Sequence, residues 1–171
     1  LEGDSLYFNR AKSFASGTNN IKVTDTLNNS LITGHYAEVY REKDSVFITK
    51  RALAATIQDK DSIFIHSDTL MITGKPENRI VRGFYNVRLY KSDISGKSDS
   101  IYVNQKKGIT KLLNIGNVPS TSVSTKRTPV IWSDNNQMTG DTIHILNNPE
   151  TEKLESLKFF YDAFIIQKDS I

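Results

Sequence analysis

A short pattern of polar and apolar positions recurs along this chain. In each copy, a small polar pair precedes an apolar residue, a residue of any type and a second apolar residue. This alternation of apolar and other residues is typical of a β-strand that follows a turn. Close copies begin at residues 4, 44, 61, 99 and 141, and looser copies begin at 68 and 155. Most close copies lie about 40 residues apart, which leaves room for a pair of strands with their turns. Such a unit cannot bury its own apolar face, so we expect successive hairpins to stack.

Residues 79–90 show the clearest alternation between two faces. Arg82, Asn86 and Arg88 occupy the polar face of this stretch. Such a stretch is typical of an antiparallel sheet with one buried and one wet face. The predicted buried face holds Val81, Gly83, Tyr85, Val87 and Leu89.

Residues 61–74 carry two copies of the pattern that are out of phase. Ile63 and Ile65 have odd numbers, whereas Leu70 and Ile72 have even numbers. A straight strand would point these two pairs toward opposite faces. We therefore expect a bulge or bend at residues 66–68, which would return all four to a common face.

Several stretches lack a decisive pattern. Residues 50–58 are alanine-rich but lie between strands, so they are predicted to be extended. Residues 150–166 fit both helical and strand spacing, and the copy at 155 favours strands. Residues 17–20 and 135–140 carry clusters of turn-forming residues and are predicted to be turns. Residues 117–129 have no periodicity and are predicted to form a loop.

Composition limits the class of protein. The chain has 171 residues, 37% of them apolar, enough for one domain with a core. It begins on one copy of the pattern and ends inside another, so we expect residues 1–171 to be a single β domain within a longer protein. The absence of cysteine excludes disulfides, thiolate ligands and a cysteine nucleophile. No apolar run approaches the ~20 residues of a transmembrane helix.

Charge and motifs argue against several activities. The net charge is +3 and the basic residues are scattered, which disfavours nucleic-acid binding. His35, His66 and His144 lack ligand spacing, so no metal site is predicted. Neither a nucleophile elbow nor a phosphate-binding glycine loop is present. We predict neither an enzyme nor a cofactor.

The repeated unit and two further features resemble a known family. Gly34-His35-Tyr36 and Gly83-Phe84-Tyr85 place a Gly-x-Tyr segment in two predicted strands. Together with the Asp-Ser-apolar-x-apolar unit, they resemble the OstA/LptA-like (organic solvent tolerance protein-like) family of lipopolysaccharide-transport proteins. The most specific part spans residues 128–143 and is similar to the Bacteroidetes-type members. The resemblance covers roughly residues 4–171.

The resemblance implies an all-β fold, a twisted antiparallel β-jellyroll or slotted β-sandwich. Its apolar groove would accept the acyl chains of lipopolysaccharide (lipid A) for transport to the outer membrane of a Gram-negative cell. It implies a periplasmic or outer-membrane-associated protein. The implied partners are other β-jellyroll proteins of the transport system, with end-to-end self-association through terminal strands. The alternatives are a structural or adhesive β-solenoid without ligand, and the periplasmic domain of an outer-membrane translocon.

An acyl chain needs a dry, continuous apolar lining. The apolar positions of the repeats would supply stacked rows facing one interior, or they would pack against each other as a closed core. The candidate lining residues are Leu6, Phe8, Val46, Ile48, Ile63, Ile65, Val87, Leu89, Ile101, Val103, Ile143 and Ile145.

Two polar or aromatic sets accompany this lining. Arg82, Arg88 and Lys91 are candidates for contacts with lipid A phosphates, or they form a solvated face. The middle positions of the repeats are expected on the face opposite the lining, as cross-strand neighbours that stabilise the sheet or as a contact stripe for a partner. These positions hold Tyr7, Phe47, Phe64, Tyr102 and His144.

Overall fold

The computed structural model describes residues 1–27, 29–57, 62–91, 94–115, 128–151 and 153–167. Within these ranges the chain forms thirteen strands and two short 3-10 helices, η1 (Arg41–Lys43) and η2 (Pro76–Asn78). The strands are β1 (Ser5–Asn9), β2 (Phe14–Asp25), β3 (Ser30–Tyr40), β4 (Ser45–Thr56), β5 (Ile63–Thr73), β6 (Ile80–Lys91), β7 (Ile94–Asn104), β8 (Ile109–Leu113), β9 (Val130–Ser133), β10 (Asn136–Thr139), β11 (Thr142–Asn147), β12 (Leu154–Phe160) and β13 (Phe164–Gln167).

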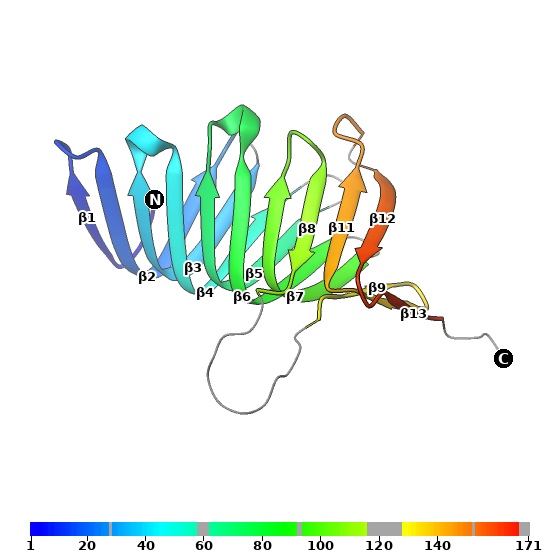
Figure 1. The fold of residues 1–171 in the computed structure, drawn as a ribbon. Helices are drawn as coiled ribbons and strands as arrows, with labels where there is room; N and C mark the ends of the chain where they lie inside the picture. The colour runs from blue at the N-terminus through cyan, green and yellow to red at the C-terminus, as the bar shows by residue number, and fades with distance from the viewer. Residues whose placement is uncertain (28, 58–61, 92–93, 116–127, 152, 168–171) are drawn as a thin grey trace, which may run out of the picture.

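All the strand pairs are antiparallel, and they form one sheet that is folded along its length (Figure 1). β1 to β8 pair in sequence order, and β11 and β12 continue the same edge. At β7 the sheet divides, because residues 100–104 pair with β8 while residues 94–97 pair with β9. β10 and β13 continue from β9. We call the half that contains β1, β8, β11 and β12 the front wall, and the half that contains β9, β10 and β13 the rear wall.

The even-numbered long strands cross from one wall to the other through pairs of residues with left-handed backbone. Asn19-Asn20 in β2, Lys50-Arg51 in β4 and Tyr85-Asn86 in β6 all have φ between +48° and +62°. Tyr161-Asp162 repeats this conformation between β12 and β13. None of these residues is glycine, although side chains disfavour this region by about 1–2 kcal/mol each. The pairing register shifts at all three pairs within the long strands, and these pairs therefore mark the line along which the sheet folds.

The odd-numbered strands bend at the same line by a different device. In β5 the Ser67 hydroxyl donates to the Thr69 carbonyl at 2.7 Å, and in β7 the Ser98 hydroxyl donates to the Ser100 carbonyl at 2.8 Å. Gly34 occupies the matching place in β3, where an added Cβ would collide with the Ile48 side chain. The inward side switches from odd to even numbers along β5, with Ile65 and Leu70 both buried. The bulge predicted at residues 66–68 is thus confirmed by the register shift between His66 and Thr69.

The structure confirms some sequence predictions and corrects others. Residues 50–56 are extended within β4, and within the ambiguous stretch 150–166, residues 154–160 and 164–166 form strands rather than a helix. Residues 17–20, predicted to be a turn, lie inside β2 at the fold line, because their left-handed residues bend a strand instead of ending it. The predicted turn at 135–140 contains the short strand β10. The predicted loop 117–129 lies almost wholly outside the described residues.

Two further corrections concern the faces and the repeats. Tyr85 was predicted on the buried face, but it belongs to a left-handed pair at the fold line and its side chain is exposed. The copies of the pattern at 68 and 99 do not begin strands. They lie in the middle of β5 and β7, at the bulges that bend them. Asp and Ser serve both turns and bulges because their side chains bond nearby backbone.

The core lies between the walls and is built from registered rows of inward side chains. One front-wall row runs across ten neighbouring strands in direct register. Its members are Leu6, Gly17, Ala37, Ile48, Leu70, Gly83, Ile101, Leu112, Ile143 and Phe159. A rear-wall row faces it and includes Ile32, Ala54, Ile65, Leu89, Ile131 and Met138. Most of these residues belong to one buried apolar cluster.

Candidate functional site: the slot between the walls

The two walls are joined along the fold line, so the space between them is a slot with its mouth at the opposite long side. Front-wall hairpin turns and rear-wall strand ends form the two rims of this mouth (Figure 1). Of the predicted lining residues, seven are buried in the cluster between the walls and three pack against it. The buried ones are Ile48, Ile65, Val87, Leu89, Ile101, Ile143 and Ile145, and the partly buried ones are Val46, Ile63 and Val103.

Leu6 and Phe8 stand apart from this set. They lie on the edge strand β1, in register with Gly17 and Ala15 of β2. Their side chains are 53% and 59% exposed. The inner surface therefore remains open to solvent at the N-terminal edge of the front wall.

Side chains of both walls pack together in the slot, and the two cavities described there are small. A cavity of about 30 Å³ lies near the mouth, with Ile65, Leu89, Val103 and Ile145 in its lining. A second cavity, of about 60 Å³, adjoins the turn at Gly108. These volumes suit a few water molecules rather than an acyl chain. A lipid could enter only if the walls moved apart.

An ion pair closes the mouth near its N-terminal end. The Arg79 Nε lies 3.4 Å from Asp25 Oδ2, joining the front-wall turn after η2 to the end of β2 in the rear wall. Both side chains are largely buried, 18% and 20% exposed. The Arg79 Nη1 also donates to the carbonyls of Gly74 and Asp44. Arg79 thus ties two front-wall turns to the rear wall.

A second polar contact closes the mouth further along. The Lys91 Nζ donates to Asn147 Oδ1 at 3.4 Å, which joins the end of β6 in the rear wall to the end of β11 in the front wall. Lys91 also lines both small cavities. This predicted phosphate-contact residue therefore lies at the mouth of the slot. We refer to the Arg79–Asp25 and Lys91–Asn147 contacts together as the mouth clasps.

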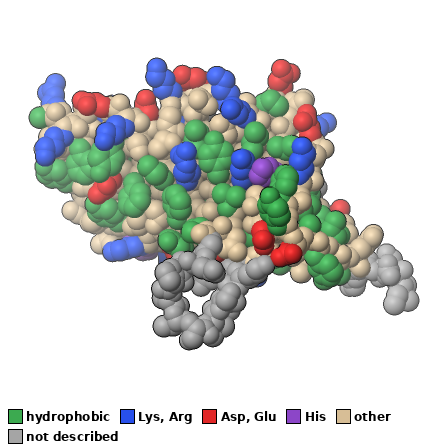
Figure 2. Space-filling model, in the orientation of Figure 1, with side chains coloured by type: hydrophobic (Ala, Val, Ile, Leu, Met, Phe, Trp, Pro, Cys, Tyr) green, Lys and Arg blue, Asp and Glu red, His purple; other side chains and the backbone are tan. Residues whose placement is uncertain are grey.

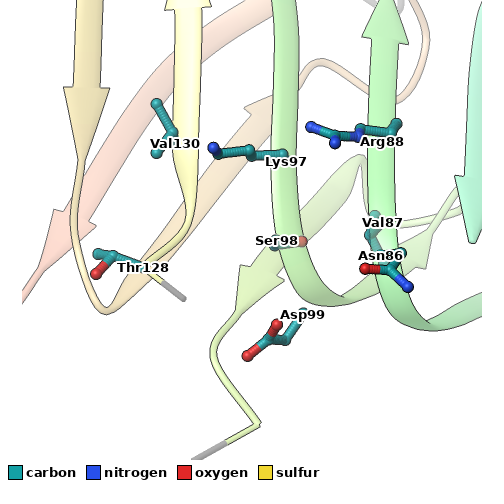
Figure 3. Close-up of a pocket in the computed structure, with 8 residues that line it drawn as sticks. All are labelled: Asn86, Val87, Arg88, Lys97, Ser98, Asp99, Thr128 and Val130. Carbon is teal, nitrogen blue, oxygen red and sulfur yellow. The ribbon is translucent and has the colours of Figure 1, made fainter. Parts of the chain in front are cut away.

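Arg82 and Arg88 were predicted on one polar face, and together with Lys91 as phosphate contacts, and the structure separates them. The bend in β6 places Arg82 on the outer face of the front wall and Arg88 on the outer face of the rear wall. Arg88 lines an outer pocket of about 410 Å³ with Asn86, Lys97 and Asp99 (Figure 3). A straight-strand reading of 79–90 cannot anticipate this, because the left-handed pair lies in its middle.

The middle positions of the repeats lie opposite the lining, as predicted. Tyr7, Phe47, Tyr102 and His144 belong to one outward row of the front wall, while Phe64 lies on the outer face of the rear wall. Phe64 pairs there with Tyr90, at 6.2 Å between ring centroids. Contacts of this kind between rings on neighbouring strands support the interpretation that the middle positions stabilise the sheet.

The C-terminal part of the outward row is basic. Lys111 and Lys158 are the direct cross-strand partners of His144 on either side. Burial and the two lysine charges lower the pKa of His144 below its usual 6.5. Arg82 lies over the Tyr102 ring, 5.3 Å from its centroid, and Tyr102 is the cross-strand partner of Lys111. Sequence reasoning missed this cluster because its members come from separate strands.

The two ends of the sheet present edge strands with exposed apolar side chains. At the C-terminal edge, Phe164, Ile165 and Ile166 of β13 are 59%, 60% and 48% exposed. Among the described strands, β13 pairs only with β10, and β12 only with β11. Such edges offer backbone groups to another strand.

Neither a cluster of metal ligands nor a membrane-spanning helix occurs among the described residues. No group of three or more His, Asp or Glu side chains gathers there in a way that could hold a metal ion. Among the same residues, no helix has the length and apolar character to cross a membrane.

In fold, the chain is a twisted, slotted β-jellyroll of the kind predicted. It is similar to the crystal structure of LptH from Pseudomonas aeruginosa, described as the LptA-homologous periplasmic component of the conserved lipopolysaccharide transport device. The match has a TM-score of 0.64 at 14% sequence identity and covers 78% of this chain and 92% of that one. At this identity the likeness establishes the fold. No known family and no curated protein matches the chain by sequence.

Proposed function

We propose that this protein binds the acyl chains of lipopolysaccharide in the slot between its walls and takes part in lipopolysaccharide transport to the outer membrane. One observation carries the proposal. The two facing walls present registered apolar rows over nearly their whole length, and the space between them has a polar mouth along one side. A dry lining with a few polar groups at its entrance suits an amphiphile. The likeness in fold to a lipopolysaccharide-transport component supports the same cargo.

Uptake requires the mouth clasps to open. When the walls separate, Arg79 and Lys91 would exchange their protein partners for the phosphates of lipid A, with charge-assisted hydrogen bonds. The acyl chains would then replace wall-to-wall contacts, so apolar surface stays buried in both states. Arg82 and Arg88 lie outside the slot and play no part in this step.

The exposed edges support a role in a chain of similar domains. β1 at one end and β12 with β13 at the other could pair with matching edges of a second copy or of another β-jellyroll in the transport system. This assembly fits a periplasmic bridge or the periplasmic domain of an outer-membrane translocon, with residues 1–171 as one domain of a longer protein of Bacteroidetes type. Ile165→Lys should weaken concentration-dependent association in light scattering.

Site-specific photo-cross-linking tests the cargo and its location. A photoreactive residue at Val46 or Ile101 should label added lipopolysaccharide, because both side chains face the slot. The same group at Lys106, in an exposed front-wall turn, is the control. Labelling confined to Lys106 would overturn the slot as the binding site.

A second candidate is a structural β-module without a ligand. The packing of both walls in the slot favours it, because closed packing needs no cargo. Native mass spectrometry of the purified protein distinguishes the two. Co-purified lipid, seen as an added mass that is lost on collisional activation, supports transport. A ligand-free protein that also fails to bind added lipopolysaccharide supports the structural module.

A further inference from the structure

The outer face of the front wall carries a charged row that the slot does not use. Arg82, Tyr102, Lys111, His144 and Lys158 follow one another in direct register across β6, β7, β8, β11 and β12. Cations thus recur on alternate strands, with an aromatic ring or an imidazole between them. The row extends over four strand spacings, about 19 Å. Figure 2 shows Lys and Arg side chains gathered beside a histidine on this face.

This row has no compensating acid in its C-terminal part. The diagonal neighbours of His144 in β8 and β12 are Ile109, Leu113, Ser156 and Phe160. Within the described residues, the ion pairs are Lys22–Glu2 and Arg79–Asp25, and neither involves this face. The three cations stand on alternate strands, so each charge is separated from the next by one aromatic or imidazole ring. A row of cations of one sign, without a carboxylate beside Lys111, His144 or Lys158, is complementary to an anionic partner.

Apolar side chains flank the charges on the same face. The Phe160 ring lies 4.8 Å from the imidazole of His144, between centroids, and is 38% exposed. Met71 precedes Arg82 in the row and is 36% exposed. Phe47 stands next to Met71. The face therefore combines cations with exposed apolar and aromatic side chains, as surfaces do that lie at a membrane–water interface.

We propose that this outer face docks on an anionic lipid bilayer, with Arg82, Lys111 and Lys158 against the headgroups and Phe160 and Met71 at the level of the glycerol. The shape of the face decides between occupants. It is the outside of a sheet and not a groove, so it meets a plane more fully than a narrow polymer. A single small anion would span only the Lys111–Lys158 pair and leave Arg82 unmatched. The proposal does not depend on what the slot binds.

Docking would present the molecule to a membrane side-on. The front wall would lie along the bilayer, while the mouth clasps and both sheet edges stay accessible, because they lie at the borders of that wall. A protein held in this way could exchange an amphiphile with the membrane through its mouth and still pair with neighbours at its ends.

Vesicle co-sedimentation of the full chain tests this surface. Vesicles of phosphatidylcholine mixed with phosphatidylglycerol should bind the protein, and vesicles of phosphatidylcholine alone should bind it weakly. Lys111→Gln/Lys158→Gln should lower the partition coefficient on the anionic vesicles about 25-fold, since each cation near an anionic surface contributes about five-fold. Added salt should reduce binding of the wild type more than that of the double variant.

The matched control removes two cations from the opposite side. Lys22 and Lys97 both lie on the outer face of the rear wall, so Lys22→Gln/Lys97→Gln has the same net charge as the test variant. It should keep wild-type binding within about two-fold, since charges far from the contact are screened. Equal loss in both double variants, equal binding to both kinds of vesicle, or retention on a heparin column without vesicle binding would each overturn the proposal.

Discussion

The Arg79–Asp25 clasp makes a prediction in which stability and lipid uptake change in opposite directions. Asp25→Asn removes the carboxylate charge while keeping the size of the side chain. Both partners are about four-fifths buried, so the pair is poorly screened by solvent. Removing one member of a buried pair costs about 3–5 kcal/mol. The Arg79 Nε has no well-aligned hydrogen bond, although Nη1 keeps its two carbonyl partners, so we expect a smaller loss of about 1–2 kcal/mol.

Urea unfolding followed by tryptophan fluorescence measures the first effect, and binding of lipopolysaccharide measures the second. If the clasp holds the slot closed, the variant should be less stable and yet bind lipopolysaccharide more tightly, because part of the opening cost has been removed. The matched control is Glu2→Gln, whose exposed ion pair with Lys22 at 3.9 Å should contribute almost nothing. An Asp25→Asn protein that loses stability without any gain in binding would refute the clasp as a gate.

Three further predictions concern the bends and the basic row. Gly34→Ala should cost about 1–3 kcal/mol in urea unfolding, because its Cβ would collide with Ile48 and lie 3.0 Å from the Thr49 carbonyl oxygen; unchanged stability would mean that β3 bends differently. Arg51→Gly should gain roughly 0.5–1 kcal/mol, since Arg51 is exposed at φ +61° and glycine removes the left-handed cost; the same change at Lys22, in regular strand, should lose stability. The lowered pKa of His144 means that the unfolded chain binds its proton more tightly. Stability should therefore fall as pH drops from about 6.5 toward the folded pKa, and His144→Gln should lose less between roughly pH 7.5 and 5.5 than the wild type. An identical loss in both proteins would contradict the assigned environment.

Much of the fold follows from local patterns in the sequence. The period-2 alternation and the repeat spacing predicted stacked hairpins, and the phase change between Ile65 and Leu70 predicted the bulge in β5. These features are readable because each depends on residues only a few positions apart. The strand at 154–160 was predicted through the same repeat, and the extended stretch at 50–56 was predicted from the strands on either side of it.

The left-handed pairs explain most of the errors. Asn19-Asn20 looks like a turn because asparagine tolerates left-handed backbone, yet here it bends a strand that continues on the other wall. Lys50-Arg51 gives no local signal, since these residue types rarely adopt the conformation, and in Tyr85-Asn86 the asparagine is the one residue that tolerates it. The left-handed conformation of these pairs is required because the two walls must face each other. That requirement is a property of the whole sheet and cannot be read from a few neighbouring residues.

The candidate site divides in the same way. Ten of the twelve predicted lining residues were found because they belong to the repeats, and Val87 and Leu89 were found from the alternation in 79–90. Inward residues outside these patterns, such as Ile21 and Ile131, were not found. The mouth clasps were not predicted, because Asp25 and Arg79 are far apart in the sequence and meet only after the sheet folds back on itself. Arg82 and Arg88 were grouped for the opposite reason, since they are close in sequence and the bend in β6 separates them.

The distance between the two rims of the mouth tests the central claim most directly. The chain has no cysteine, so introduced cysteines would be the only sites of labelling. Gln105→Cys would place a spin label at an exposed position on the front-wall rim, and Asp134→Cys would place one on the rear-wall rim. Pulsed electron paramagnetic resonance should give a single short distance between the two spin labels in the free protein and a longer one after lipopolysaccharide is added. The delipidated sugar portion should leave the separation unchanged. A protein that binds lipopolysaccharide with no change in this distance would contradict uptake between the walls.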